Sequence, residues 1–218
     1  MNHDGTVTVS EVFYSIQGES TWTGLPCAFV RLAGCNLRCR WCDTAYAWEG
    51  GETRTIAEVT AEAVSYGANL TEITGGEPLL QEGTPLLAQE LLDLGQIVLC
   101  ETNGTLPIDR LPAGVVRIMD IKCPGSGCHE ETDWANIARL NERDEVKFVI
   151  AGRADYEWAR DIIMQNSLVD RCRAVLAAPA SGGQSARELA QWILMDALPV
   201  RLQIQVHKVV WPGGTEGV

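Results

Sequence analysis

Strand-like and helix-like segments alternate along this chain, and that alternation is the feature that most restricts its fold. Short apolar runs typical of buried strands occupy residues 28–32, 70–74, 97–101, 115–121, 146–150, 174–178 and 201–206. Amphipathic segments typical of helices occupy residues 55–66, 85–94, 133–140 and 155–165, and a further helix is expected after Ser185. Repeated strand–helix units of this kind predict a mainly parallel sheet with helices on its outside.

The number of these units decides between an open and a closed barrel. The chain has 218 residues and about six such units, whereas a closed eight-stranded barrel takes about 250 residues. We therefore expect an α/β fold of the partial, open (β/α)6 type, with residues 1–218 forming a single domain. In such folds the active site lies at the carboxyl ends of the strands, so functional residues are expected just after the strands.

Three of the eight cysteines lie close together after the first expected strand. Cys35, Cys39 and Cys42 are separated by three and then two residues, a spacing typical of metal ligands rather than of disulfides. Three thiolates on a four-iron cluster leave one iron without a protein ligand, and that iron can bind a small molecule. The alternative is a structural zinc site, which needs four protein ligands. Only a coincidence of the fold would let Cys27 or Cys123 supply the fourth.

A second segment, residues 74–80, ends the next strand and reads TGGEPLL. Its two glycines allow the backbone to approach a ligand closely, and the carboxylate of Glu77 can accept hydrogen bonds from an ammonium group. The alternative is an ordinary glycine turn. Residues 101–105 (ETNGT) and 120–124 (DIKCP) end two further strands, and we expect both to contact a cofactor, again with a plain turn as the alternative.

Composition argues against several other classes of protein. The formal net charge of −12 would repel a polyphosphate, which argues against a general nucleic-acid binder or a membrane-surface protein. The longest apolar runs are far too short to span a bilayer, and the first ten residues are too polar for a signal peptide. We therefore expect a cytoplasmic protein with reduced cysteines that binds neither nucleic acid nor membranes.

The motifs resemble those of the radical S-adenosylmethionine superfamily, whose CxxxCxxC motif has an aromatic residue before its last cysteine, here Trp41. The resemblance implies a 4Fe–4S cluster on Cys35, Cys39 and Cys42. It also implies that S-adenosylmethionine binds to the open iron and is cleaved to a radical that abstracts hydrogen from a substrate. The residues that the resemblance assigns to this cofactor are Trp41, Gly76, Glu77, Glu101, Asn103, Asp120 and Lys122.

Segments near the two ends of the chain narrow the resemblance. SIQGE (15–19) and QVHK (205–208), with CDT (42–44) between them, resemble the 7-carboxy-7-deazaguanine synthase family. Its members convert 6-carboxy-5,6,7,8-tetrahydropterin to 7-carboxy-7-deazaguanine and ammonia by a radical ring contraction, require Mg2+ and are homodimeric. The resemblance implies Mg2+ at Thr44. The implied substrate contacts are Ile16, Gln17, Gly18, Glu19, Arg31, Thr74 and His207.

The residue types suit such a substrate. The planar guanidinium of Arg31 matches a carboxylate, and Glu19 can pair with the N–H donors of a pterin edge. The hydroxyl of Thr44 is an oxygen ligand of the kind that Mg2+ takes. For Arg31 the alternative is a structural ion pair, and for His207 it is a packed strand histidine. The tail, residues 211–218, lies where family members vary.

Two arginines of the cluster loop suggest how the cluster receives its electron. Arg38 and Arg40 lie in the cluster loop of an acidic chain, where they are placed to attract an acidic one-electron donor such as a flavodoxin. The nearest rival function is a radical activase for a glycyl-radical enzyme, which shares the cysteine motif but has no need of SIQGE and QVHK. A rival of another class is a non-catalytic iron–sulfur or zinc-binding module.

Overall fold

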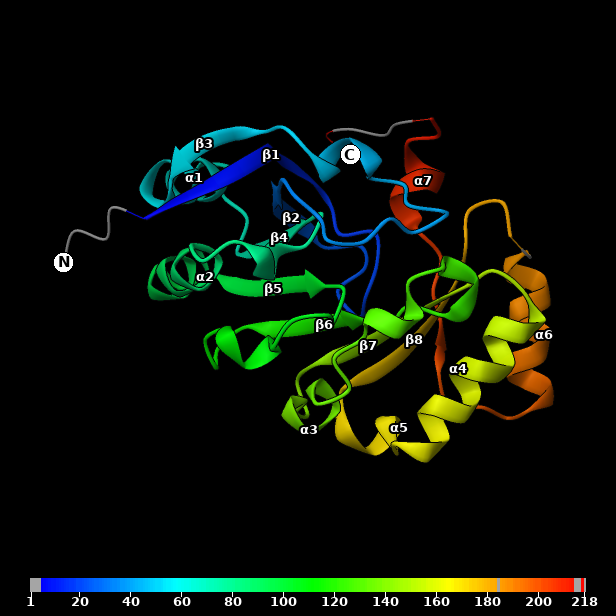
Figure 1. Ribbon diagram of the computed structural model, residues 1–218. Helices are drawn as coiled ribbons and strands as arrows, with labels where there is room; N and C mark the ends of the chain where they lie inside the picture. The colour runs from blue at the N-terminus through cyan, green and yellow to red at the C-terminus, as the bar shows by residue number, and fades with distance from the viewer. Residues whose placement is uncertain (1–4, 184, 214–216, 218) are drawn as a thin grey trace.

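The computed structural model describes residues 5–183, 185–213 and 217, and within them one nine-stranded sheet carries the fold (Figure 1). The order of strands across the sheet is β3-β1-β2-β4-β5-β6-β7-β8-β9. Neighbours from β2 to β9 run parallel, whereas β1 is antiparallel to both β2 and β3. The order is linear rather than circular, so the predicted open α/β barrel is confirmed.

The strands are β1 (Thr6–Ile16), β2 (Pro26–Leu32), β3 (Glu52–Thr55), β4 (Leu70–Gly75), β5 (Ile97–Thr102), β6 (Val116–Asp120), β7 (Glu145–Ile150), β8 (Ala174–Pro179) and β9 (Arg201–Leu202). The helices are α1 (Ile56–Ser65), α2 (Thr84–Asp93), α3 (Asn136–Arg139), α4 (Arg153–Gln165), α5 (Leu168–Arg171), α6 (Ala186–Met195) and α7 (Val206–Val210).

Helices cover the outer face of the sheet, and their apolar stripes form most of the core (Figure 1). Capping boxes fix where two of them begin: Thr55 with Glu58 at α1, and Ser185 with Glu188 at α6. The packed helix residues include Val59 of α1, Leu87 and Leu91 of α2, Tyr156 and Ile163 of α4, and Leu189 of α6. Their burial holds the strands in place from outside.

The inner face of the barrel carries two kinds of side chain, because alternate residues of a strand point the same way. Near the amino ends of the strands, a small apolar cluster fills the interior, with the rings of Phe13 and Phe29 stacked at 4.8 Å between centroids. Two residues further along several of the same strands, the inward positions become charged. These charged positions are Arg31 of β2, Glu72 of β4, Glu101 of β5 and Asp120 of β6.

Two predicted elements are present but shorter than expected. The strand expected at 201–206 ends at Leu202, because the side chains of Gln203 and Gln205 turn to bond Glu19, and the chain then enters α7. The helix expected at 133–140 shrinks to α3, where the Asn136 amide donates to the carbonyls of Gly104 and Leu106. The sequence analysis also missed β1 and β3. Within the described ranges, no helix is long and apolar enough to cross a bilayer.

Candidate active site

One cavity opens at the carboxyl ends of the strands and gathers nearly all of the expected site residues. It contains the three cluster cysteines, Trp41 and Thr44 from the loop after β2. The expected substrate contacts that line it are Ile16, Gln17, Gly18, Glu19, Arg31, Thr74 and His207. The expected cofactor contacts that line it are Trp41, Gly76, Glu101, Asn103, Asp120 and Lys122. Of the residues expected to contact the cofactor, Glu77 alone does not line the cavity.

The cysteine loop is held by backbone contacts on both sides. Gly34 N donates to Ala47 O at 2.9 Å, and Arg40 N donates to Ser126 O at 3.2 Å. The thiols of Cys35, Cys39 and Cys42 are half-buried and line the cavity. Three thiols from one loop, facing one cavity, fit a cluster ligated by three cysteines and leave room for a small ligand beside it.

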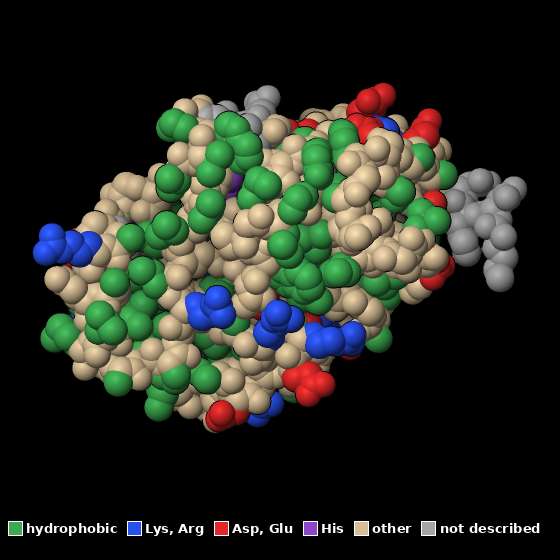
Figure 2. Space-filling view, turned by 180° about the vertical axis from the view of Figure 1, so that it is seen from behind, with side chains coloured by type: hydrophobic (Ala, Val, Ile, Leu, Met, Phe, Trp, Pro, Cys, Tyr) green, Lys and Arg blue, Asp and Glu red, His purple; other side chains and the backbone are tan. Residues whose placement is uncertain are grey.

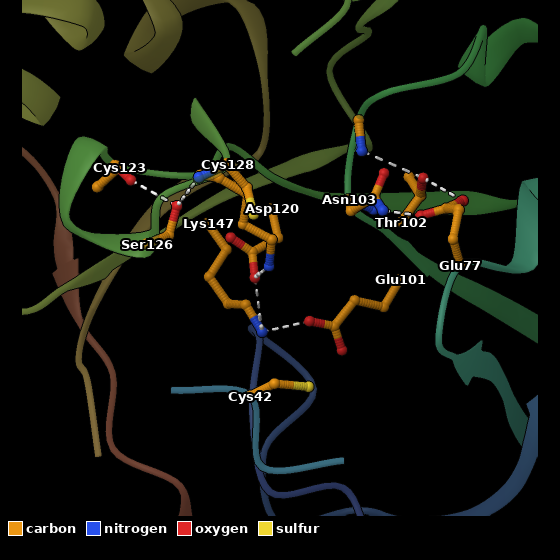
Figure 3. Close-up of polar contacts among 12 residues, drawn as sticks. Cys42, Glu77, Glu101, Thr102, Asn103, Asp120, Cys123, Ser126, Cys128 and Lys147 are labelled. Carbon is orange, nitrogen blue, oxygen red and sulfur yellow. Dashed lines mark hydrogen bonds and ion pairs between the residues drawn. The ribbon is translucent and has the colours of Figure 1, made fainter. Parts of the chain in front are cut away.

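Neither of the two cysteines considered as a fourth ligand completes a zinc site at this loop. Cys27 and Cys123, the two residues considered as a fourth ligand, are buried and do not line the cavity. Cys123 O instead accepts from Ser126 Oγ at 2.6 Å, and Ser126 Oγ accepts from Cys128 N at 3.0 Å (Figure 3). This tight turn after β6 supports the cluster loop through Ser126 O. His207, distant in sequence, does line the cavity.

The paired glycines after β4 are required by close packing against the β2 end. At Gly75, φ is +143°, and a Cβ there would lie 2.1 Å from Leu32 O. At Gly76, a Cβ would lie 2.1 Å from Gly34 O and 2.8 Å from Cys35 Cβ. Any larger residue would therefore push the cluster loop away from the strand end.

Glu77 does not face the cavity as the sequence analysis expected. Its side chain is fully buried and accepts hydrogen bonds from Leu79 N at 2.9 Å, Thr102 Oγ1 at 2.8 Å and Asn103 N at 2.6 Å (Figure 3). Three protein donors hold this carboxylate, and Glu77 does not line the cavity. The geometry therefore makes Glu77 a support that ties the end of β4 to the end of β5, rather than a ligand of an ammonium group.

A buried charge network crosses the floor of the cavity. Lys147 of β7, 6% exposed, donates to Glu19 at 2.9 Å and to Glu101, and its ammonium lies 3.8 Å from Asp120 (Figure 3). Lys122 donates to Asp120 at 2.7 Å. Burial alone would lower the pKa of Lys147, but the surrounding carboxylates raise it well above its usual value. Lys147 is therefore charged.

Glu72 is a second buried charged residue in the barrel interior. Its carboxyl accepts a short hydrogen bond from Gln17 Nε2, and it lines the cavity. Burial, together with the charges of Glu101 and Glu19, raises the pKa of Glu72 well above its usual value. Gln17 Oε1 accepts from Glu19 N at 2.9 Å, so Glu72 fixes the direction of the amide that shapes this loop.

The segment after β9 fastens the loop at residues 17–20 to the cluster loop. Val206 N donates to Gly18 O at 3.0 Å, and Gln205 Nε2 donates to Glu19 Oε1 at 2.7 Å. Lys208 pairs with Asp43 at 2.6 Å. His207 does not lie in a strand, as the packing alternative assumed, but in α7 over Gly18.

Arg31 forms the structural ion pair that the sequence analysis gave as the alternative to substrate binding. Its guanidinium forms an ion pair with Glu11 at 2.6 Å and lies over the rings of Phe13 and Tyr46 at 5.5 and 5.8 Å from their centroids. It also lines the cavity. The ion pair uses Nε of Arg31, so the contact with Glu11 orients the guanidinium. Arg31 still reaches the cavity in this orientation.

The sequence analysis left Lys147 unassigned and did not consider Glu72. Both lie inside strands rather than after them, so a search of strand ends passes over them. The signal was a charged residue within a buried strand, since burial of an unpaired charge is costly and such residues are kept only with partners.

Comparison with known proteins agrees with this fold and site. Residues 30–119 match the model of the radical SAM superfamily. The open barrel and the three-cysteine loop at its mouth, together with this match, define a radical S-adenosylmethionine protein.

Similarity over the full length identifies the family. The 7-carboxy-7-deazaguanine synthase of Chlorobaculum tepidum is 47% identical, with all of both chains covered. That of Koribacter versatilis is 43% identical, covering 96% of this chain and 99% of the relative. A crystal structure of QueE from Escherichia coli superposes with a TM-score of 0.71 at 25% identity, covering 91% of this chain and 94% of that one. The chain belongs to the 7-carboxy-7-deazaguanine synthase family.

Proposed function

We propose that this chain converts 6-carboxy-5,6,7,8-tetrahydropterin to 7-carboxy-7-deazaguanine and ammonia. The observation that carries the proposal is that the cluster cysteines and the expected pterin contacts line the same cavity, in a chain similar to these synthases over its full length. The radical activase is not favoured, because its large protein substrate requires none of the residues that resemble pterin contacts.

The charge of the cavity suits the proposed ligands. Its lining holds five acids and three cations: Glu19, Asp43, Glu72, Glu101 and Asp120 against Arg31, Lys122 and Lys147. Carboxylates in the lining attract a cationic sulfonium cofactor, although burial raises the pKa of Glu72 and Glu101 and so reduces their share of the negative charge. When bound and reduced, the cluster and S-adenosylmethionine supply the radical that removes a hydrogen atom from the substrate.

The chain's own residues then bind and orient the substrate. Arg31 is the cation that suits the pterin carboxylate, since its planar fork matches two oxygens. Glu19 is held as an acceptor for N–H donors: burial raises its pKa, but Lys147 and Gln205 lower it below the usual value. Both therefore keep the charge that the proposed contacts need at neutral pH.

Mg2+ at Thr44 is part of the proposal. The hydroxyl of Thr44 lies 3.7 Å from Cys42 Sγ, at the start of the 3-10 turn Ala45–Trp48, so it faces the cavity beside the cluster cysteines. One protein oxygen with ligand oxygens and water suits this ion. Replacing Thr44 with valine should lower product formation at limiting Mg2+ without loss of iron, and loss of iron would place Thr44 in the cluster support instead.

A homodimer in the cytoplasm is also proposed. Figure 2 shows hydrophobic side chains in several patches on one face of the molecule. The segment around α7 leaves several large apolar side chains exposed, as sites of association do. They are Leu202, Ile204, Val209, Val210 and Trp211. Light scattering of the reconstituted protein should give twice the mass of the chain, and a mass of one chain would reject the dimer.

Electron delivery is proposed to use the two arginines of the cluster loop. Arg38 donates to Cys35 O at 2.7 Å and its guanidinium lies 4.8 Å from the Trp48 ring centroid. Arg38 and Arg40 are both exposed, so an acidic donor such as a flavodoxin could approach them. Charge reversal at both should slow turnover with the protein donor but not with a small chemical reductant. Equal slowing with both reductants would reject this role.

The experiment that tests the function uses oxygen-free, iron-reconstituted protein. Carboxytetrahydropterin, S-adenosylmethionine, Mg2+ and a chemical reductant should give ammonia and a deazapurine absorbance. Cys39→Ala should lose iron and product, whereas Cys172→Ala, at a buried cysteine that does not line the cavity, should keep both. Cofactor cleavage without a deazapurine would refute the proposed substrate, and a protein that binds no iron would refute the enzyme class.

A further inference from the structure

The side chain of Lys147 in β7 contacts carboxylates from three other segments of the chain. Its ammonium pairs with Glu101 and, at 3.8 Å, with Asp120 (Figure 3). It also pairs with Glu19 at 2.9 Å. Glu19 comes from the loop between β1 and β2, and Asp120 is the sheet neighbour of Lys147 across β6 and β7. One buried cation thus joins carboxylates that are far apart in the sequence.

These carboxylates belong to the two halves of the proposed site. Glu19 lies in the loop proposed to hold the pterin, whereas Glu101 and Asp120 lie at strand ends proposed to contact S-adenosylmethionine. We propose that Lys147 is a positioning residue that aligns the substrate loop with the cofactor-binding strand ends. This inference rests on the proposed function for the identity of the ligands, but the geometry of Lys147 does not depend on it.

No other described cation can take over this role. Among the residues that the structure describes, Glu19 and Glu101 form ion pairs with Lys147 alone, whereas Asp120 also has Lys122. The remaining partners of Glu19 are the neutral amides of Gln203 and Gln205.

Loss of the ammonium would therefore leave two half-buried carboxylates without a cation between them. Like charges held close together repel strongly where water cannot screen them. The strand-end residue Glu101 is fixed by the sheet, so the loop that carries Glu19 is the part that moves. We expect the amides of this loop to become less protected and the pterin to bind more weakly.

The test compares Lys147→Met and Lys147→Arg with wild type and with Arg117→Met, all as cluster-loaded full-length protein. Arg117 is a matched control, because it is a buried cation on the neighbouring strand β6, paired with Asp144, and it does not line the cavity. Its loss should lower the melting temperature without moving the loop. Lys147→Arg keeps the charge and should restore part of what Lys147→Met loses.

Three quantities are measured: amide hydrogen exchange of residues 17–25 without pterin, the KM for carboxytetrahydropterin, and the 5′-deoxyadenosine formed per deazapurine. Removing one partner of a buried charge pair typically costs enough to weaken binding about tenfold or more. Lys147→Met should raise KM by about that factor, raise the ratio of deoxyadenosine to product, and speed loop exchange. Arg117→Met should change none of the three.

Two outcomes overturn the inference. One is loop exchange in Lys147→Met equal to wild type, and the other is equal acceleration in Arg117→Met, which would show general loosening of the barrel. If wild type makes no deazapurine, the proposed function fails, yet the exchange comparison still decides the role of Lys147. If Lys147→Met does not fold, Lys147→Arg replaces it in the test. The inference then requires that the amides of residues 17–25 exchange more slowly in Lys147→Arg than in a Glu19→Gln variant.

Discussion

Replacing Glu77 with glutamine tests whether this residue supports the fold or binds the cofactor. The carboxylate accepts from three donors, Leu79 N, Thr102 Oγ1 and Asn103 N, in a fully buried position. A glutamine has one acceptor oxygen, so its NH2 group must face at least one of these donors. The change keeps the shape of the side chain but leaves a buried donor without an acceptor.

The size of the effect follows from that count. A buried donor left unpaired costs about 1–3 kcal/mol, and the remaining hydrogen bonds lose their charge assistance. Burial raises the pKa of Glu77, so removal of the charge gives back part of this loss. We take about 2 kcal/mol as the net cost, which for a chain of this size lowers the melting temperature by about 4–8 °C.

The assay is thermal unfolding of the cluster-loaded protein by circular dichroism, with S-adenosylmethionine affinity measured by equilibrium dialysis. Glu82→Gln is the matched control, because Glu82 is exposed and lies five residues further along; it should change stability by less than about 0.5 kcal/mol. A Glu77→Gln protein that melts with the control but has lost the cofactor would refute the support role. Glu77 would then be the ligand that the sequence predicted.

Two further predictions concern the substrate loop. Gly18→Ala should raise the KM for the pterin and leave S-adenosylmethionine affinity unchanged, since a Cβ at Gly18 would lie 1.9 Å from His207 Nδ1. The control is Gly152→Ala, because a Cβ at Gly152 would have nothing within 4 Å. An unchanged KM in Gly18→Ala would contradict the predicted clash. Burial lowers the pKa of His207, so the unfolded chain binds more protons as pH falls through the ordinary histidine range, and stability should decrease there. Urea unfolding between about pH 7.5 and 5.5 should show a steeper loss for wild type than for His207→Gln, and equal slopes would contradict the shift.

Much of the site could be predicted because parallel strands place their carboxyl ends together. Asn103 follows β5, whereas Asp120 ends β6 and Lys122 lies just after it, yet all three line one cavity. The cysteine spacing identified the cluster loop for a similar reason: its geometry is local, so the sequence contains it. What the sequence could not show is which neighbour satisfies each charge. Glu77 lies next to the ligand-binding glycines, but its carboxylate turns inward to β5.

The course of the C-terminal segment was beyond prediction because contacts with residues distant in sequence, many of them from side chains, hold it. Gln203 Oε1 accepts from Ser20 N at 2.7 Å, and Gln203 Nε2 donates to Glu19 at 2.7 Å. These partners lie more than 180 residues earlier in the chain, so no local periodicity signals them. Ser20 adopts a left-handed φ of +63°, uncommon for a residue other than glycine, at the point where the two segments meet.

These contacts also explain how an open barrel can hold a small substrate. The backbone ladder stops at β9, and the gap between β9 and the β1–β2 side is crossed by the amides of Gln203 and Gln205 reaching the loop at residues 17–20. A bridge of side chains can open and close without breaking the sheet, whereas a closed ladder cannot. Two sets of contacts therefore fix the position of Glu19. The amides of Gln203 and Gln205 in the C-terminal segment donate to its carboxylate, and so does the ammonium of Lys147 in β7.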